Sequence, residues 1–176
     1  IGSSAATDRL TGANLVNDWT IAGADNQITS AGMTLAFRVI EELVGGMNVD
    51  TFKFNDGAVF NGSLDGGAGL DVLDYSAYTT ARTVTLTGVG ATDGFSGREA
   101  SLTGTFTNMN MLIGSSLNSD RLIGANLVNS WTLTSVDNQI TSGGKTLAFR
   151  SVEELVGGTN ADTFKFNNGV VFNGSI

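Results

Sequence analysis

Large apolar residues alternate with polar or small residues along several short segments of the chain. This period of two is the pattern of β-strands that bury one face. Gly, Asn, Asp and Ser bound the segments, and these residues favour turns. The alternation is clear over residues 19–21, 33–37, 51–54 and 82–87, and weaker over 101–106. It predicts an all-β fold with a core formed by Trp19, Ile21, Leu35, Phe37, Phe52, Phe54 and Phe60.

One segment leaves two interpretations open. Residues 37–44 read FRVIEELV, and their apolar positions also fit a helical turn. Residues 106–113 (FTNMNMLI) hold the same place before a Gly turn, but they contain Thr and two Asn, which are poor helix formers. We therefore predict strands in both segments, with a helical turn in 37–44 as the alternative.

The chain repeats itself. Residues 1–64 align with residues 113–176 at an offset of 112 without a gap, and 46 of the 64 positions are identical. This self-similarity predicts a repeat unit over residues 1–112 and a partial second unit over 113–176, both part of a longer continuous array. A duplicated catalytic domain is the alternative, but no linker separates the two copies.

Smaller units recur within the repeat. Five segments share a Gly-small pair followed by an Asp and, two residues later, an apolar residue; they begin at Gly2, Gly45, Gly66, Gly114 and Gly157. Asp50 and Asp71 are 21 residues apart. We predict a β-solenoid or β-roll-like tandem repeat with coils of roughly 20 residues, interrupted by insertions. About five coils per unit would advance the axis by roughly 25 Å.

The phrase Phe-Asn also recurs, at residues 54–55, 60–61, 166–167 and 172–173. Asn side chains stacked at successive turns can satisfy main-chain groups of neighbouring coils. The pattern therefore suggests a ladder of Asn residues at one edge, with ordinary turn Asn residues as the alternative.

Composition and charge narrow the function. The chain has a net charge of −8, and its nine basic residues are scattered singly, so we expect no nucleic-acid partner. It has neither Cys nor His, which removes thiol nucleophiles and the commonest general base. The acid pair Glu41 and Glu42 recurs as Glu153 and Glu154, which suits a structural role better than a glycosidase site. We expect no enzyme here and, with no long apolar run, no membrane span.

The segment Gly66–Asp74 reads GGAGLDVLD and matches the nonapeptide G-G-x-G-x-D-x-U-x. One such turn supplies only part of the six to eight oxygens that calcium prefers, so a second must stack on it. The candidate is Gly45–Lys53, GGMNVDTFK. The predicted calcium-site residues are Gly45, Gly46, Asn48, Asp50, Gly66, Gly67, Gly69 and Asp71. Metal-free corners, held by hydrogen bonds from main-chain amides to Asp, are the alternative.

The motif GGAGLDVLD resembles the calcium-binding nonapeptides of the repeats-in-toxin family. The phrases at Leu73–Leu86 and Phe37–Phe54 resemble repeats of very large bacterial surface proteins of the haemagglutinin and adhesin type. The resemblance implies a β-roll or β-solenoid, an extracellular place at the bacterial cell surface, one-step secretion, and adhesion or coat formation.

These observations lead to three functional hypotheses. The first is a structural extracellular repeat protein that forms a surface filament, coat or adhesin stalk and associates with itself end to end or laterally. The second is a calcium-dependent adhesive or carbohydrate-binding module, whose outward Thr83, Thr85 and Thr87 face a polysaccharide or another cell surface. The third is a secretion-associated repeat region of a larger enzyme.

Overall fold

The computed structural model describes residues 2–3, 7–117 and 119–176, and within these ranges every regular element is a β-strand. The all-β prediction is therefore confirmed. Residues 37–44 hold the end of one strand and the start of another, so the helical alternative is wrong there. Part of the predicted Gly-to-Asp segment that begins at Gly2 lies outside the described residues, as does Ile1.

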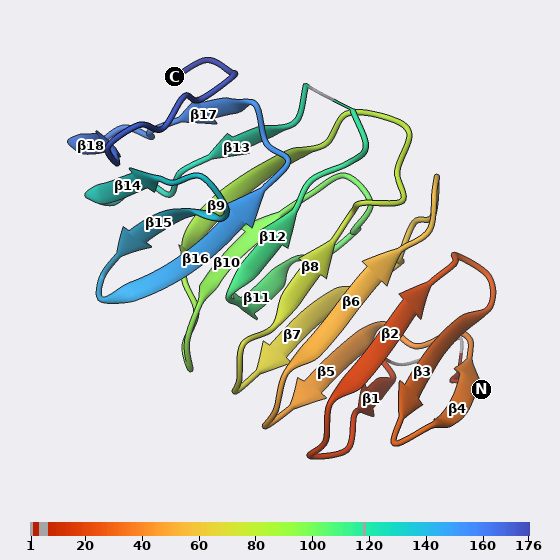
Figure 1. The fold of residues 1–176 in the computed structure, drawn as a ribbon. Coiled ribbons are helices and arrows are strands. Elements are labelled where there is room, and N and C mark those ends of the chain that lie inside the picture. The colour runs from red at the N-terminus through yellow and green to blue at the C-terminus, as the bar shows by residue number, and fades with distance from the viewer. Residues whose placement is uncertain (1, 4–6, 118) are drawn as a thin grey trace.

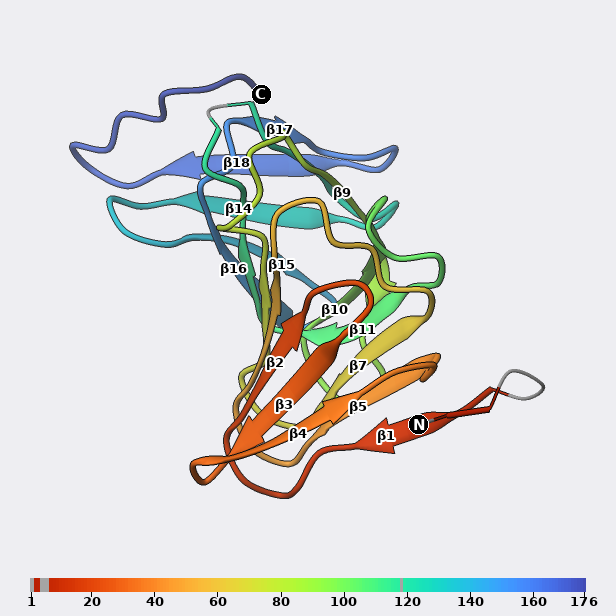
Figure 2. The same cartoon turned by 90° about the vertical axis from the view of Figure 1, so that its right-hand side faces the viewer.

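The strands form two sheets that face each other across one core (Figures 1 and 2). The eight-stranded sheet has the order β1 (Arg9–Thr11), β5 (Glu42–Gly46), β7 (Ser63–Gly67), β11 (Phe106–Met109), β10 (Phe95–Arg98), β9 (Thr83–Val89), β13 (Arg121–Ile123) and β17 (Glu154–Val156). The ten-stranded sheet has the order β18 (Asp162–Phe166), β14 (Asn129–Leu133), β15 (Asn138–Ser142), β16 (Lys145–Arg150), β12 (Met111–Ile113), β8 (Val72–Asp74), β6 (Asp50–Phe54), β2 (Asn17–Ile21), β3 (Asn26–Ser30) and β4 (Met33–Phe37).

The chain crosses repeatedly from one sheet to the other, and consecutive passes pair in parallel. In the ten-stranded sheet Phe52 pairs with Trp19 on one side and with Leu73 on the other. The rings of Trp19 and Phe52 stack with centroids 5.4 Å apart. Equal positions of successive passes thus form buried columns, which is what the period-two alternation requires of a sheet with one buried face.

Both sheets are mixed, which corrects the expectation of a simple stack of coils. The antiparallel hairpin β3–β4 is added to the ten-stranded sheet, and the antiparallel pair β9–β10 is added to the eight-stranded sheet. Each sheet advances by six strands per unit, from β1 to β13 in one and from β4 to β16 in the other. One unit therefore spans about 29 Å at ~4.8 Å per strand, rather than the roughly 25 Å expected.

Six of the seven predicted core residues are buried, but Leu35 is 55% exposed. Leu35 lies on β4, the last strand of its sheet, where no further strand covers it. The weak alternation over residues 101–106 was also misleading. Only Phe106 belongs to a strand, and Leu102 makes a single isolated bridge to Phe60.

The second unit repeats the packing of the first. Trp131 stacks on Phe164 with centroids 5.2 Å apart and an interplanar angle of 14°, compared with 13° for Trp19 and Phe52. Both Trp side chains are fully buried. Trp19 and Trp131 therefore occupy equivalent places in the core.

Candidate functional site

The two Gly-rich turns singled out in the sequence lie against each other. Gly45 and Gly46 end β5, Gly66 and Gly67 end β7, and Gly46 pairs with Gly67 in the parallel register. The amide of Ala68 donates to the carbonyl of Gly46 at 2.9 Å. The turns at residues 45–50 and 66–71 are thus stacked along one edge of the molecule, where the chain leaves one sheet for the other.

This close approach explains two of the glycines. A Cβ atom on Gly45 would overlap the carbonyl oxygen of Gly66 and the Oδ2 atom of Asp50. Gly69 has φ of 138°, and a Cβ there would press on the carbonyl of Asn48. The side chain of Asn48 itself is exposed and donates to the carbonyl of Asn14 at 2.7 Å.

Asp50 and Asp71 belong to a line of side-chain acceptors that runs along the same edge. The amide of Asn17 donates to Oδ1 of Asp50 at 3.1 Å. The amide of Asp50 donates to Oδ1 of Asp71 at 2.9 Å, and the amide of Asp71 donates to Oδ1 of Asn110 at 3.1 Å. We call Asn17, Asp50, Asp71 and Asn110 the Asn/Asp ladder. Each step satisfies one main-chain amide just where a strand begins.

Asn17 begins the ladder and also closes its own turn. Its Nδ2 atom donates to the carbonyls of Ala13 and Leu15, at 2.9 and 3.0 Å, and to Oδ1 of Asp50. In the second unit Asn129 donates in the same way to its own turn and to Oδ1 of Asp162 at 2.6 Å. The arrangement thus recurs with the repeat.

Sequence reasoning missed Asn17, Asn110 and Asn129, and placed an Asn ladder at the Phe-Asn phrases instead. The Asn residues of those phrases have exposed side chains: Asn55, Asn61, Asn167 and Asn173. A usable signal was present, because the block GANLVN is identical in both units and its last Asn precedes an Asp by 33 residues each time.

The two central acids of the ladder are buried without full hydrogen bonding. Asp50 and Asp71 are both 0% exposed, and the Oδ2 atom of each lacks a partner. Burial raises the pKa of Asp50 to about 6, although the hydrogen bonds from Asn17 oppose the shift. Burial raises the pKa of Asp71 to about 7, and the nearby acids Asp50, Asp93 and Asp65 add to the rise. The fold therefore favours the neutral acids.

The unpartnered oxygens are also what a cation would use. Oδ2 of Asp50 and Oδ2 of Asp71 lie against the glycine-lined turns, so the residues present supply oxygen ligands of the type that calcium prefers. Two carboxylate oxygens supply a third or less of its usual ligands, and the carbonyl of Gly46 already accepts a hydrogen bond. No group of three or more metal-ligating side chains occurs in the part of the chain that the structure describes.

A second buried polar cluster lies near β8, β9 and β10. Arg82 forms an ion pair with Glu99, whose side chain is 1% exposed while that of Arg82 is 12% exposed. The guanidinium of Arg82 lies 4.2 Å from the ring centre of Tyr78. Ser101 Oγ donates to Glu99, and it lies 3.2 Å from the hydroxyl of Tyr75, with which it forms a second hydrogen bond. The cluster ties the segments around β8, β9 and β10 together.

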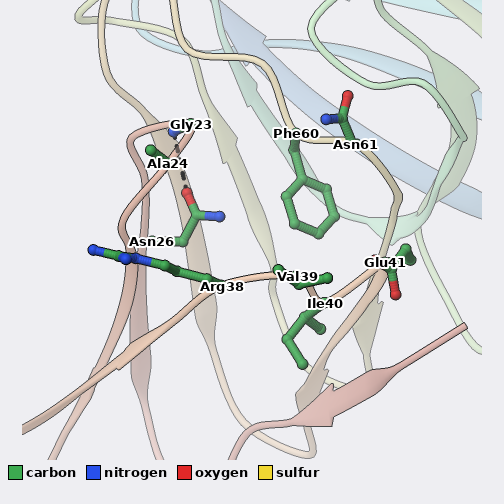
Figure 3. A pocket seen from close by; sticks show the side chains of 9 residues that line it. All are labelled: Gly23, Ala24, Asn26, Arg38, Val39, Ile40, Glu41, Phe60 and Asn61. Carbon is green, nitrogen blue, oxygen red and sulfur yellow. Dashed lines mark hydrogen bonds between the residues drawn. The ribbon is translucent and has the colours of Figure 1, made fainter. Parts of the chain in front are cut away.

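A surface cavity of about 320 Å³ lies between the loop after β4 and the segment at Phe60 (Figure 3). Three of its four polar side chains make hydrogen bonds or ion pairs within the fold, and the fourth, Asn61, is exposed. Asn26 accepts from two turn amides, Arg38 pairs with Asp25, and Glu41 accepts from the amide of Asp8. These contacts indicate that the cavity is a structural corner in which most polar side chains stabilise the fold.

Comparisons with protein-family models, with curated proteins and with solved structures find no match for this chain. The resemblance to toxin-type and adhesin-type repeats therefore rests on the sequence motifs alone. Across the described ranges, no helix has the length and apolar character needed to cross a membrane.

Proposed function

We propose that this chain is a section of a β-solenoid array whose role is structural, as part of a filament, coat or adhesin stalk at a bacterial cell surface. The observation that carries the proposal is the continuity of both sheets across the junction of the two units. In the eight-stranded sheet, β13 of the second unit pairs in parallel with β9 of the first. In the ten-stranded sheet, β16 of the second unit pairs in parallel with β12 of the first.

Sheet continuity favours a rod over a string of separate domains. The two units share one hydrophobic core, and Leu112 pairs with Phe149 across the junction. Each further unit added in this way extends the same two sheets and leaves the cross-section unchanged. A structural role needs no more than this, since length and stiffness follow from the number of units.

Small-angle X-ray scattering on chains of one, two and three tandem units tests the array. The maximum dimension should grow by about 29 Å per added unit at constant cross-sectional radius. A compact particle, whose radius of gyration grows roughly as the 0.38 power of chain length, would overturn the proposal.

The cell-surface location rests on the motif resemblance. Proteolysis of intact cells that make the full protein tests it, because a surface array is cut while cytoplasmic markers survive. The outward Thr83, Thr85 and Thr87 lie on the single strand β9, and no polysaccharide-binding face is proposed from them.

Calcium binding at the stacked turns is a second candidate, favoured by the unpartnered Oδ2 atoms of Asp50 and Asp71. Bound calcium would raise the melting temperature through mass action. The hypothesis predicts a rise of the melting temperature with millimolar calcium over chelator, and no rise in Asp71→Asn. An identical melting temperature in calcium and chelator would leave the Asn/Asp ladder as a purely structural device.

A further inference from the structure

The N-terminal end of the molecule exposes apolar side chains that the second unit buries. Leu35 is 55% exposed, whereas Leu147, at the same position of the repeat, is 1% exposed. Ala13 is exposed, whereas its counterpart Ala125 is fully buried. Together with Leu10, Leu15, Ile28 and Met33 they line a cavity of about 310 Å³, which we call the N-terminal surface.

The structure shows what covers the equivalent surface of the second unit. Strand β16 pairs with β12, so that Ala148 lies beside Met111 and Phe149 beside Leu112. Strand β13 pairs with β9 in the opposite sheet, with Leu122 beside Val84. The cover is therefore the segment of residues 83–113, which belongs to the first unit except for Ile113.

Two inserted antiparallel pairs meet at this junction. The eight-stranded sheet runs β11-β10-β9-β13, and the ten-stranded sheet runs β12-β16-β15-β14. The first unit thus contributes β9–β10 to one sheet, and the second unit contributes β15–β16 to the other. A Cβ atom placed on Gly143, in the turn between β15 and β16, would lie 3.6 Å from Val89 of β9. With these inserted pairs, both sheets advance by the same number of strands, six, per unit.

We propose that the N-terminal surface docks a segment with the sequence character of residues 83–113, supplied by a preceding unit of the array. The proposal rests on the proposed function. Hairpin β3–β4 then meets the counterpart of β9–β10, and Ala36 and Phe37 lie beside the counterparts of Met111 and Leu112. A separate copy of this chain cannot take the place, because its own β9 and β12 already pair with β13 and β16.

The chemistry of the surface matches this occupant. The residues that line the cavity include no charged side chain, and the residues that cover the second unit bring the apolar Val84, Val89 and Leu112 to the junction. One polar contact differs. Lys145 donates to the carbonyl of Thr92, whereas Met33 stands at the equivalent position and adds apolar area instead. Ala31 replaces Gly143 and leaves ordinary van der Waals room for the counterpart of Val89.

The test adds a copy of residues 65–112 in front of residue 1, which reproduces the natural junction of Leu112 and Ile113. Amide hydrogen exchange is compared for residues 34–37 and 146–149. In the chain of residues 1–176, residues 34–37 should exchange at least roughly tenfold faster than residues 146–149. In the extended chain, the two rates should become similar. An extension with Val84→Asp and Leu112→Asp in the added copy should leave residues 34–37 fast.

Unchanged fast exchange of residues 34–37 in the extended chain would overturn the docking proposal, whether or not the added segment is itself protected. Scattering separates this failure from failure of the array. If chains of several units form a rod but the hairpin β3–β4 stays unprotected, the array proposal stands and the docking proposal fails. If the hairpin is protected but the particle does not lengthen with added units, the docking proposal stands and the array proposal fails.

Discussion

The main-chain amide of Asp50 donates to the Oδ1 atom of Asp71 at 2.9 Å, so two buried acids, one at the start of β6 and one just before the neighbouring strand β8, belong to one hydrogen-bonded line. An ionised carboxylate is the better acceptor, yet burial favours the neutral form of both residues. Burial has the larger effect on the pKa of both acids, since one oxygen of each carboxyl group has no hydrogen-bond partner. The ladder therefore responds to pH near neutrality.

The first prediction is a loss of stability as the pH rises from about 5 to 8. The pKa values of Asp50 and Asp71, about 6 and about 7, lie above the ordinary value of 3.8. Their protonated forms thus contribute stability that is complete below pH ~4 and is lost as the pH passes 6 to 7. Asp71→Asn keeps an Oδ1 acceptor but does not titrate. Its free energy of unfolding, taken relative to that of wild type, should therefore rise by roughly 1–2 kcal/mol between pH 5 and pH 8.

Urea unfolding at a series of pH values measures this difference. Asp56→Asn is the control, because hydrogen bonds from the amide and the hydroxyl of Thr79 lower the pKa of exposed Asp56. Its stabilising effect is lost only on acidification, so its difference from wild type should stay flat between pH 5 and pH 8. A flat profile for Asp71→Asn as well would show that the buried acid does not titrate in this range.

The second prediction concerns the Asn residues that begin the ladder in each unit. Asn17→Ala and Asn129→Ala should each lower the free energy of unfolding by about 2–3 kcal/mol, because each leaves two turn carbonyls without their side-chain donor and removes one of the two hydrogen bonds to the Asp carboxyl group of the next strand. The two sites share no partner, so the double variant should lose about the sum. Losses below about 0.5 kcal/mol in urea melts would mean that water replaces the amide at no cost.

Local periodicity was sufficient to predict much of the core. Trp19, Phe52 and Phe54 alternate with polar neighbours, and the sheet buries them as their spacing requires. The offset of 112 residues likewise aligns Trp131 with Trp19, and the two side chains do have the same stacked and buried environment. These inferences succeed because the face of a strand is decided within a few residues of the chain.

The other features of the fold and of the candidate site depend on contacts between residues far apart in the sequence, which no local pattern contains. The phrase TLAFR is identical in both units, yet Leu35 is exposed and Leu147 is buried, because only the second is covered by residues 83–113. The partnership of Asn17 with Asp50 spans 33 residues and needs the parallel register to be known. Of the candidate site, the stacking of the two turns was foreseeable, whereas the ladder of acceptors was not.

The third prediction uses these identical phrases as a matched pair. Leu147→Ala should lower the free energy of unfolding by about 2–4 kcal/mol, since it removes a fully packed side chain. Leu35→Ala makes the same chemical change on the exposed strand β4 and should cost less than about 0.5 kcal/mol. Chemical denaturation of both variants tests the contrast. Equal losses would mean that the N-terminal surface is covered in the isolated chain, by self-association or by rearrangement.

The last prediction concerns the buried pair of Arg82 and Glu99. Glu99→Ala should lower the free energy of unfolding by about 3–5 kcal/mol, because it leaves the guanidinium of Arg82 in the core without its counter-charge. The matched surface change is Glu154→Ala, which removes the partner of the half-exposed Arg121 and should cost at most about 1 kcal/mol.

A double variant decides whether the charge or the packing of this pair matters. Arg82→Met with Glu99→Leu removes both charges and keeps most of the volume, so it should recover the greater part of the stability lost in Glu99→Ala. Calorimetric melting of the three variants measures the recovery. A double variant as unstable as Glu99→Ala would assign the loss to the contacts of Arg82 with the Tyr78 ring and of Glu99 with Ser101, which no apolar replacement can restore.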